Sequence, residues 1–328
     1  MHGTTDSKDD AVSAHAALCT TREALRARLI GREALVERLL IALLTGGHVL
    51  IEGAPGLAKT RAVKQFADLI AADFVRIQAT PDLLPADLTG TTVFRPESGG
   101  FEFVEGPLFS NIVLVDEINR APPKVQSALL EAMGERQISA GGVTRALARP
   151  FMVAATQNPI EHEGTYPLPE AQLDRFLFFV DIPMPGLEEE RAILDLALSE
   201  RTAVDGGARP LGRQALEAAQ ARVAATHLSA AVRDFIVRLV AATRGIGAGG
   251  AAAGDIEHAA SPRGSIGLAA AAQARAWLEG RDHVLPSDVE ALCVDVLCGR
   301  IGLSYRARAQ GRTGREAIAA VLERTPVV

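Results

Sequence analysis

The 328-residue sequence contains little cysteine, few aromatic side chains and no excess of basic charge. Its three cysteines, an odd number, exclude a small secreted module stapled by disulfides. The 34 Lys and Arg residues against 40 Asp and Glu leave a net charge of −6, whereas proteins that wrap nucleic acid usually carry a basic excess. Because only 4% of the residues are aromatic, the composition favours helices packed through small side chains over a β-sandwich.

Long hydrophobic runs are missing as well. The longest run near the N-terminus, residues 39–44, ends at a Thr-Gly-Gly turn, far short of the roughly 18 residues that a membrane-spanning helix needs. The polar residues 1–15 lack the charged-then-apolar layout of a signal peptide. We therefore expect a cytoplasmic protein that does not insert into membranes, with Cys19, Cys293 and Cys298 as reduced thiols.

The rest of the composition is typical of a globular protein. With 48% hydrophobic and 23% charged residues, a mostly disordered chain is excluded, and the length predicts about two domains. Short runs rich in apolar residues predict strands at 48–51, 74–78, 112–115, 151–155 and 176–180. Since the later runs are apolar throughout and helical patterns separate the strands, we expect a parallel sheet covered by helices on both faces.

After a Pro- and Gly-containing linker at residues 183–186, only helical patterns follow. They occupy 187–198, 215–226, 230–244, 263–278 and 287–300. We predict a flexible lead at residues 1–20, an α/β domain at 21–184 and an all-α domain at 187–328.

Three shorter segments carry their own signals. Residues 91–104 and 136–147 alternate around Gly-rich turns, so each predicts a hairpin. The stretch 245–254 is almost entirely Gly and Ala, which predicts a mobile loop.

The segment between the first predicted strand and the next helix has the pattern of a phosphate-binding loop. The assigned residues are Gly53, Ala54, Pro55, Gly56, Leu57, Ala58, Lys59 and Thr60. In such a loop backbone N–H groups and the start of a helix surround phosphates, Lys59 reaches the β- and γ-phosphates, and the Thr60 hydroxyl binds Mg²⁺. Ala58 departs from the usual pattern, which has Gly there, and is strained only if its φ is positive. The alternative is an ordinary Gly/Pro turn that begins a helix.

Two acids follow the strand at residues 112–115. Ligands of an open parallel sheet bind at the carboxyl ends of its strands, where Asp116 and Glu117 would lie. Asp116 would support Mg²⁺ and Glu117 would act as the general base for an attacking water. The alternative is a pair of solvated acids before the next helix.

Three later polar residues complete the candidate catalytic set. Asn158 follows another apolar strand and would orient water, unless it is a turn residue before proline. Arg175 begins a strand and would stabilise charge in a neighbouring subunit's site, unless it pairs with Asp174. Arg263 opens a helix, where a positive charge opposes the helix dipole unless an anion is near.

Four blocks of sequence resemble the MoxR family of AAA+ ATPases. They are GAPGLAKT, NIVLVDEINRAPPKVQSALLEAMGERQIS, FMVAATQNPIEHEGTYPLPEAQLDRF and ASPRG, in this order, and the similarity covers about residues 22–310. The resemblance implies an α/β AAA+ P-loop domain with a five-stranded parallel sheet, followed by an all-α lid domain. Lys59 and Thr60 then form the Walker A pair, and Asp116 and Glu117 the Walker B pair.

The same resemblance assigns the remaining site residues. Asn158 matches sensor 1, Arg175 the arginine finger that acts on a neighbouring subunit, and Arg263 the sensor 2 that acts within its own subunit. The hairpin at 91–104 corresponds to the helix-2 insert. The family often has His where Gly299 stands here, a departure that concerns the lid and not the chemistry.

The resemblance also implies a function and partners. It implies a homo-oligomeric ring, taken as a hexamer, that hydrolyses ATP with Mg²⁺. Hydrolysis would drive chaperone-like remodelling, maturation or metal-cofactor insertion in a client protein, with a von Willebrand factor A domain protein as adaptor. Two alternatives remain: a chelatase-type motor subunit, and a nucleic-acid-stimulated motor whose pore contains Arg95, Arg136 and Arg145.

Overall fold

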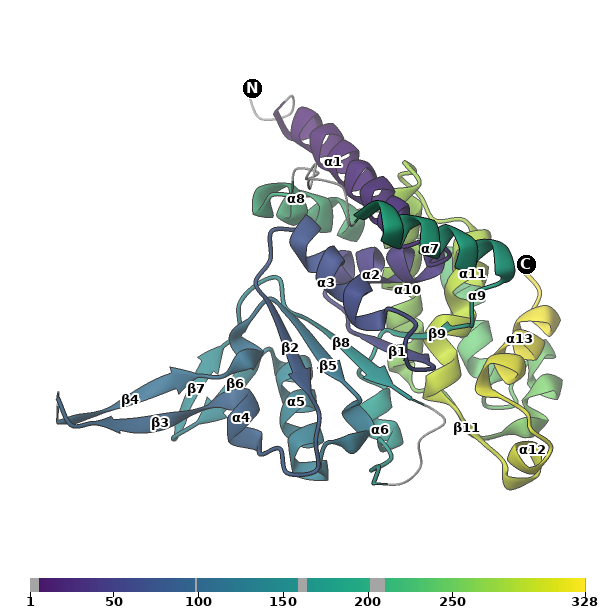
Figure 1. The fold of residues 1–328 in the computed structure, drawn as a ribbon. Coiled ribbons are helices and arrows are strands. Elements are labelled where there is room, and N and C mark those ends of the chain that lie inside the picture. The colour runs from purple at the N-terminus through teal and green to yellow at the C-terminus, as the bar shows by residue number, and fades with distance from the viewer. Residues whose placement is uncertain (1–5, 98, 159–163, 201–209, 328) are drawn as a thin grey trace.

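The computed structural model describes residues 6–97, 99–158, 164–200 and 210–327. At its centre lies a parallel five-stranded sheet with the strand order β2-β5-β8-β1-β9 (Figure 1). The strands are β1 (Val49–Gly53), β2 (Phe74–Gln78), β5 (Ile112–Asp116), β8 (Met152–Gln157) and β9 (Phe178–Ile182). The predicted parallel sheet is therefore confirmed, and β5, β8, β1 and β2 end at the edge where the candidate site residues follow.

The apolar residues of the strands alternate between two hydrophobic clusters. Val49 and Ile51 join the cluster that contains the helices α2 (Glu33–Thr45) and α3 (Lys59–Leu69). Leu50 belongs to the other cluster, together with α5 (Pro123–Glu135). Burial on both faces explains why the central strands are apolar without alternation.

Helix α1 (Asp6–Arg28) replaces most of the flexible lead expected at residues 1–20. Ala14, Leu18 and Leu25 are buried at spacings of four and seven residues, so one side of the helix enters the core. Arg22 binds Glu279 through a 2.9 Å ion pair that ties α1 to the end of α10. The expectation followed the polar first residues and overlooked this apolar spacing.

The C-terminal part of the chain is mainly helical, with small additions. Its longer helices are α7 (Leu187–Glu200), α8 (Arg213–Ala224), α9 (Ala230–Ala242), α10 (Pro262–Leu278), α11 (Pro286–Leu297) and α13 (Gly314–Arg324), and the short α12 (Tyr305–Ala309) lies between the last two. The predicted helical lid is confirmed, and it differs from an all-α domain only in that β10 (Ile256–His258) pairs with β11 (Gly302–Leu303). The predicted Gly/Ala loop is also different: most of it forms a 3₁₀ helix, η3 (Ala248–Asp255), packed against α9 and α13.

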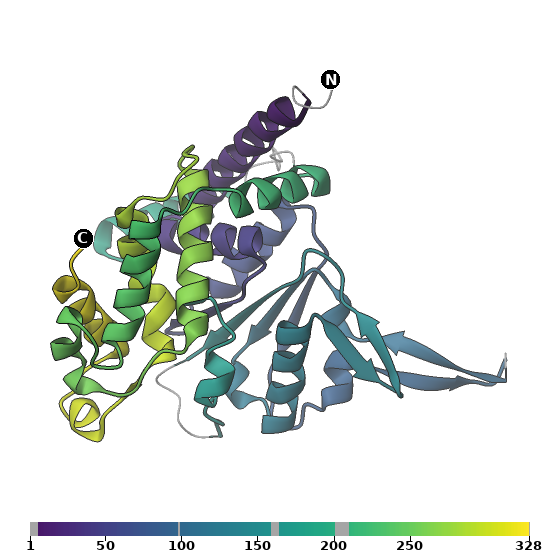
Figure 2. The same ribbon diagram turned by 180° about the vertical axis from the view of Figure 1, so that it is seen from behind.

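One hydrophobic core connects the sheet with the helices of the C-terminal part. Leu39 of α2, Val49 of β1 and Leu268 of α10 belong to a single buried cluster. Figure 2 shows α8, α9 and α10 in front, on the side of the molecule opposite to the one that α7 covers in Figure 1. The predicted boundary near residues 184–187 is thus a change of secondary structure and not a break in the core.

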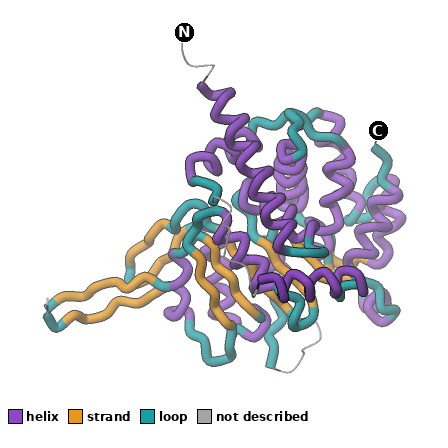
Figure 3. Tube along the Cα trace, turned by 45° about the horizontal axis from the view of Figure 1, so that its top comes forward, coloured by secondary structure: helices purple, strands orange, loops and turns teal. Residues whose placement is uncertain are grey.

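Both predicted hairpins are present. The first consists of β3 (Gly90–Arg95) and β4 (Gly100–Glu105), and the second of β6 (Gln137–Ala140) and β7 (Val143–Ala146). The β3–β4 hairpin extends away from the rest of the molecule (Figure 3), and its exposed Phe94 and Phe101 rings stack edge to face at 5.3 Å. Within the described residues, no helix is both long enough and apolar enough to cross a membrane.

Candidate active site

The phosphate-binding loop connects β1 to α3, as the sequence predicts. Gly56 has a φ of 83°, a left-handed conformation that glycine adopts without strain. The Lys59 amine donates hydrogen bonds to the carbonyl oxygens of Gly53 and Ala54, so it closes the loop on itself. Incoming phosphate oxygens would replace these carbonyls as acceptors. The Lys59 amine is therefore already positioned at the end of β1 to donate hydrogen bonds to a phosphate.

Ala58, which stands where the usual pattern has Gly, has a positive φ. Its φ of 56° and ψ of 25° lie in the left-handed region immediately before the first residue of α3. A residue with a Cβ atom in this conformation carries roughly 1–2 kcal/mol of strain. The loop therefore keeps a strained backbone at the position where phosphate would bind.

The substitution Ala58→Gly is expected to raise the free energy of unfolding by about 1 kcal/mol, because glycine relieves the left-handed strain. Urea denaturation without nucleotide measures the change. The control is Ala221→Gly at an exposed position in the C-terminal half of α8, which should lower the free energy of unfolding by about 1 kcal/mol. A destabilised Ala58→Gly variant would contradict the strain.

Asp116 is the centre of a buried polar cluster at the end of β5. Its carboxylate accepts hydrogen bonds from the hydroxyls of Thr60 and Thr156, both at 3.1 Å, and from Arg76 Nε at 2.7 Å. The Thr60 hydroxyl and the Asp116 carboxylate are hard oxygen donors, which Mg²⁺ prefers. Thr60 and Asp116 are the Mg²⁺ ligands that the sequence predicts, whereas Arg76 and Thr156, on the strands adjacent to β5, are not among the predicted residues.

Charges around the loop act on Lys59. Burial lowers the pKa of the Lys59 amine below its ordinary value, while Asp116 and Glu117 act in the opposite direction. The carboxylates thus help to keep the amine charged in a partly buried position, as phosphate binding requires.

Glu117 has an unusual backbone and a carboxylate held on one side. Its φ of 56° is left-handed, and its N–H donates to Thr156 Oγ1 at 3.0 Å. Gln78 donates to its carboxylate at 3.1 Å, and Arg120 pairs with the same oxygen at 3.2 Å. The strained backbone and these partners fix the carboxylate near the end of β2. Sequence analysis did not find Gln78, which its place at the end of a parallel strand could have suggested.

Asn158 lies where the sequence predicts it. It follows β8 directly and is buried, one strand over from Asp116 and Glu117. The structure therefore brings Lys59, Thr60 and these three residues to one edge of the sheet.

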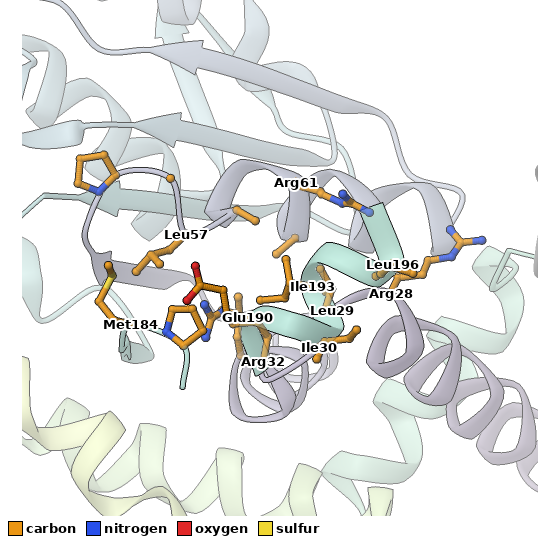
Figure 4. Close-up of a pocket in the computed structure, with 16 residues that line it drawn as sticks. Arg28, Leu29, Ile30, Arg32, Leu57, Arg61, Met184, Glu190, Ile193 and Leu196 are labelled. Atoms are coloured by element: carbon orange, nitrogen blue, oxygen red, sulfur yellow. The ribbon is translucent and has the colours of Figure 1, made fainter. Parts of the chain in front are cut away.

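A pocket of about 350 Å³ opens beside the phosphate-binding loop. Leu29 and Ile30 line it from the turn after α1, Leu57 from the loop, and Ile193 and Leu196 from α7 (Figure 4). Its size and mostly apolar wall suit a planar aromatic ring next to bound phosphates. The sequence could not reveal it, because its walls come from three separate segments.

Arg175 lies at the opposite edge of the sheet. It precedes β9, whose start is joined to the start of β1 by the hydrogen bond from Leu177 N to His48 O. A five-residue strand is roughly 17 Å long, which separates Arg175 from the loop of its own chain. Its guanidinium donates to the Leu130 carbonyl, whereas Asp174 is contacted by Arg300 and Arg263.

Arg263 contacts Asp174, the residue before Arg175, at the edge of the sheet opposite its own phosphate-binding loop. Asp174 accepts a 2.8 Å hydrogen bond from Ser261 Oγ, and Arg263 Nη1 lies 3.8 Å from the same carboxylate. The expectation that Arg263 acts on the nucleotide of its own subunit therefore does not fit its position. The resemblance assigned Arg263 to its own subunit, whereas α10 packs against α2 and its first turn contacts Asp174.

Arg300 is a further residue that sequence analysis did not single out. It is buried and binds Asp174 Oδ1 at 2.8 Å, and it also donates to the Phe176 carbonyl. The neighbouring Gly299 is required by packing, because a Cβ there would lie 2.2 Å from the Phe179 ring. The departure noted at Gly299 thus reflects close contact between the 3₁₀ helix η4 (Cys298–Arg300) and β9.

A phosphate-binding loop after β1, an Asp-Glu pair at the end of the parallel strand β5 and a following helical domain define a P-loop ATPase of the AAA+ class. Comparison with known families agrees. The family described as "ATPase family associated with various cellular activities (AAA)" matches residues 48–178, and the AAA lid domain matches residues 250–321.

Similar proteins identify the family within the AAA+ class. Chaperone MoxR1 of Mycobacterium tuberculosis is 46% identical over 86% of this chain and 74% of its own length. Protein MoxR of Paracoccus denitrificans is 36% identical over 88% of this chain and 90% of its own. The crystal structure of a candidate ATPase from Cytophaga hutchinsonii superimposes with a TM-score of 0.90 at 39% identity and covers 98% of both chains. The chain belongs to the MoxR family of AAA+ ATPases, and it hydrolyses ATP.

Proposed function

We propose that the chain forms a ring in which ATP is hydrolysed between adjacent copies, and that the ring remodels client proteins. One observation carries the ring: Arg175, and Arg263 through its contact with the neighbouring Asp174, lie at the edge of the sheet opposite the phosphate-binding loop. They can reach a nucleotide only in a neighbouring copy. The homo-oligomer, taken as a hexamer from the family resemblance, follows from this incomplete site.

The proposed reaction uses residues at both edges of the sheet. Lys59 holds the γ-phosphate, and Glu117 with Asn158 orients the attacking water. Glu117 must first release Gln78 and Arg120, which hold its carboxylate without nucleotide. Bound Mg²⁺, held by Thr60 and Asp116, would supply positive charge to the phosphate oxygens.

The neighbouring copy completes the transition state. Arg175 and Arg263 of that copy would neutralise charge that develops on the phosphate oxygens. Arg175 would exchange the Leu130 carbonyl for a phosphate, and Arg263 makes only a long contact to Asp174. Both guanidinium groups are therefore available for transfer to an anion.

For the client, we propose chaperone-like remodelling or maturation, including metal-cofactor insertion, with a von Willebrand factor A domain adaptor. Support comes from the relative named as a chaperone and from the β3–β4 hairpin, whose exposed Phe94 and Phe101 give an apolar tip for polypeptide.

Nucleic acid is a weaker candidate than protein for the substrate on which the ring acts. Arg95 pairs with Glu102 at 2.7 Å, Arg136 binds the Gly46 carbonyl, and Arg145 stacks on the Phe103 ring at 3.7 Å. These three arginines are engaged within the chain, so they do not form a free basic surface.

The experiment that tests the function is capture with the variant Glu117→Gln in the presence of ATP. This variant should hold client and adaptor stably, because it binds ATP without hydrolysing it. Lys59→Ala, which cannot hold phosphate, is the matched control and should capture neither. Mass spectrometry identifies the proteins retained. Identical sets on both variants, or DNA-stimulated hydrolysis that weakens with salt, would contradict the proposal.

A further inference from the structure

Helix α7 exposes apolar side chains on the outside of the molecule. Leu187, Leu194 and Leu198 are 85%, 59% and 50% exposed, and their spacing of seven and four residues places them on one side of the helix. We name these three residues the α7 stripe. None of the described side chains of α7 is buried, so the helix lies on the surface. An apolar stripe of this kind marks an interaction site.

The other side of α7 faces the pocket beside the phosphate-binding loop. Ile193 and Leu196 line this pocket, and Figure 4 shows both side chains directed toward it. The α7 stripe is on the reverse of the same helix. Whatever covers the stripe therefore lies one helix diameter from the nucleotide pocket.

A second exposed surface surrounds the two arginines. Ile266 is 70% exposed and follows Arg263 by one turn of α10, so both project from the same side. Arg175 is the sequence neighbour of Asp174, whose carboxylate lies 3.8 Å from Arg263 Nη1. We name Arg175, Arg263 and Ile266 the arginine face.

The two surfaces complement each other in charge and in place. The first turn of α7 carries Glu188, Glu189 and Glu190, whereas the arginine face is basic around Ile266. Helix α7 is in front in Figure 1 and α10 is in front in Figure 2, so they lie on opposite sides of the molecule. Opposite, non-identical surfaces are what a head-to-tail ring requires.

We propose that the α7 stripe of one copy docks against the arginine face of the next copy, with Ile266 packing among the three leucines. The proposal rests on the proposed ring and specifies its interface. It places Arg175 and Arg263 of one copy beside the pocket that α7 borders in the other. Because α7 lines the pocket and the interface, nucleotide binding strengthens assembly, and assembly strengthens nucleotide binding to the same degree.

The test measures assembly of full-length chains by sedimentation velocity with ATP in the Glu117→Gln background. Leu194→Glu places a charge in the stripe and should shift the protein to monomers, while a fluorescent ATP analogue still binds the monomer within a few fold. Val237→Glu is the matched control, since Val237 is 57% exposed on α9, outside both surfaces, and this variant should assemble normally.

A double variant guards against a folding defect. Ile266→Lys alone should also prevent assembly, whereas Leu194→Glu combined with Ile266→Lys sets opposite charges across every interface and should restore the ring. Assembly of Leu194→Glu equal to the parent, or no restoration in the double variant, would overturn the interface and leave the ring standing. A parent chain that remains monomeric with ATP would overturn both.

Discussion

Replacing Glu117 by Gln is expected to lower the rate of ATP hydrolysis by a factor of about 10²–10⁴ while ATP binding persists. The reason is geometric: the left-handed backbone at Glu117 and its hydrogen bond to Thr156 position one carboxylate next to Asp116. Gln keeps the shape of the side chain but cannot accept a proton from water. Phosphate release and equilibrium binding of a fluorescent ATP analogue measure the two quantities separately.

The matched control is Glu97→Gln, at an exposed position in the β3–β4 turn, which should hydrolyse ATP at the unmodified rate. Hydrolysis retained in Glu117→Gln would remove Glu117 as the base. Loss of binding together with hydrolysis would instead give the carboxylate a role in holding nucleotide.

A second large loss of ATP hydrolysis is expected when Arg175 is replaced. Arg175→Ala is expected to lower hydrolysis by a factor of about 10³–10⁵, which is typical of an arginine finger. Lys59→Ala should be inactive by itself as well. In an equal mixture, about a quarter of the sites combine an intact loop with an intact neighbouring arginine, so activity should return. Titrating one variant into the other and measuring phosphate release tests this.

Arg263→Ala mixed with Lys59→Ala separates the two possible positions of Arg263. If Arg263 acts on the neighbouring copy, the mixture regains activity in the same way as with Arg175→Ala. If it acts within its own subunit, every site lacks either Lys59 or Arg263 and the mixture stays inactive. The long contact from Arg263 to Asp174 favours the first result.

The local sequence pattern was sufficient to predict the parallel sheet and the candidate site residues at the carboxyl ends of its strands. The apolar run at residues 112–115 predicts a buried strand, and the acids after it lie at the carboxyl end because all five strands are parallel. Lys59, Thr60 and Asp116 meet for the same reason. The roles of these residues and of Asn158 remain predictions that the experiments above address.

What the sequence did not reveal depends on contacts between distant segments. Whether Arg263 lies over the loop or behind the sheet is decided by the burial of Leu268 and its neighbours against α2. Arg76 and Gln78 resemble any polar residues of an edge strand until Asp116 and Glu117 are placed beside them. The left-handed backbone of Ala58 could not be predicted either, because no local sequence pattern there gives the sign of φ.

The contacts of Asp174 have a consequence for the order of events around a ring. Its carboxylate binds Arg300 from η4 and Ser261 from the start of α10, so the segment that carries Arg175 and the helix that carries Arg263 are joined. We therefore expect the two arginines to leave a neighbour's nucleotide together and not one after the other. Each active site would then gain or lose both arginines of its neighbour in a single step.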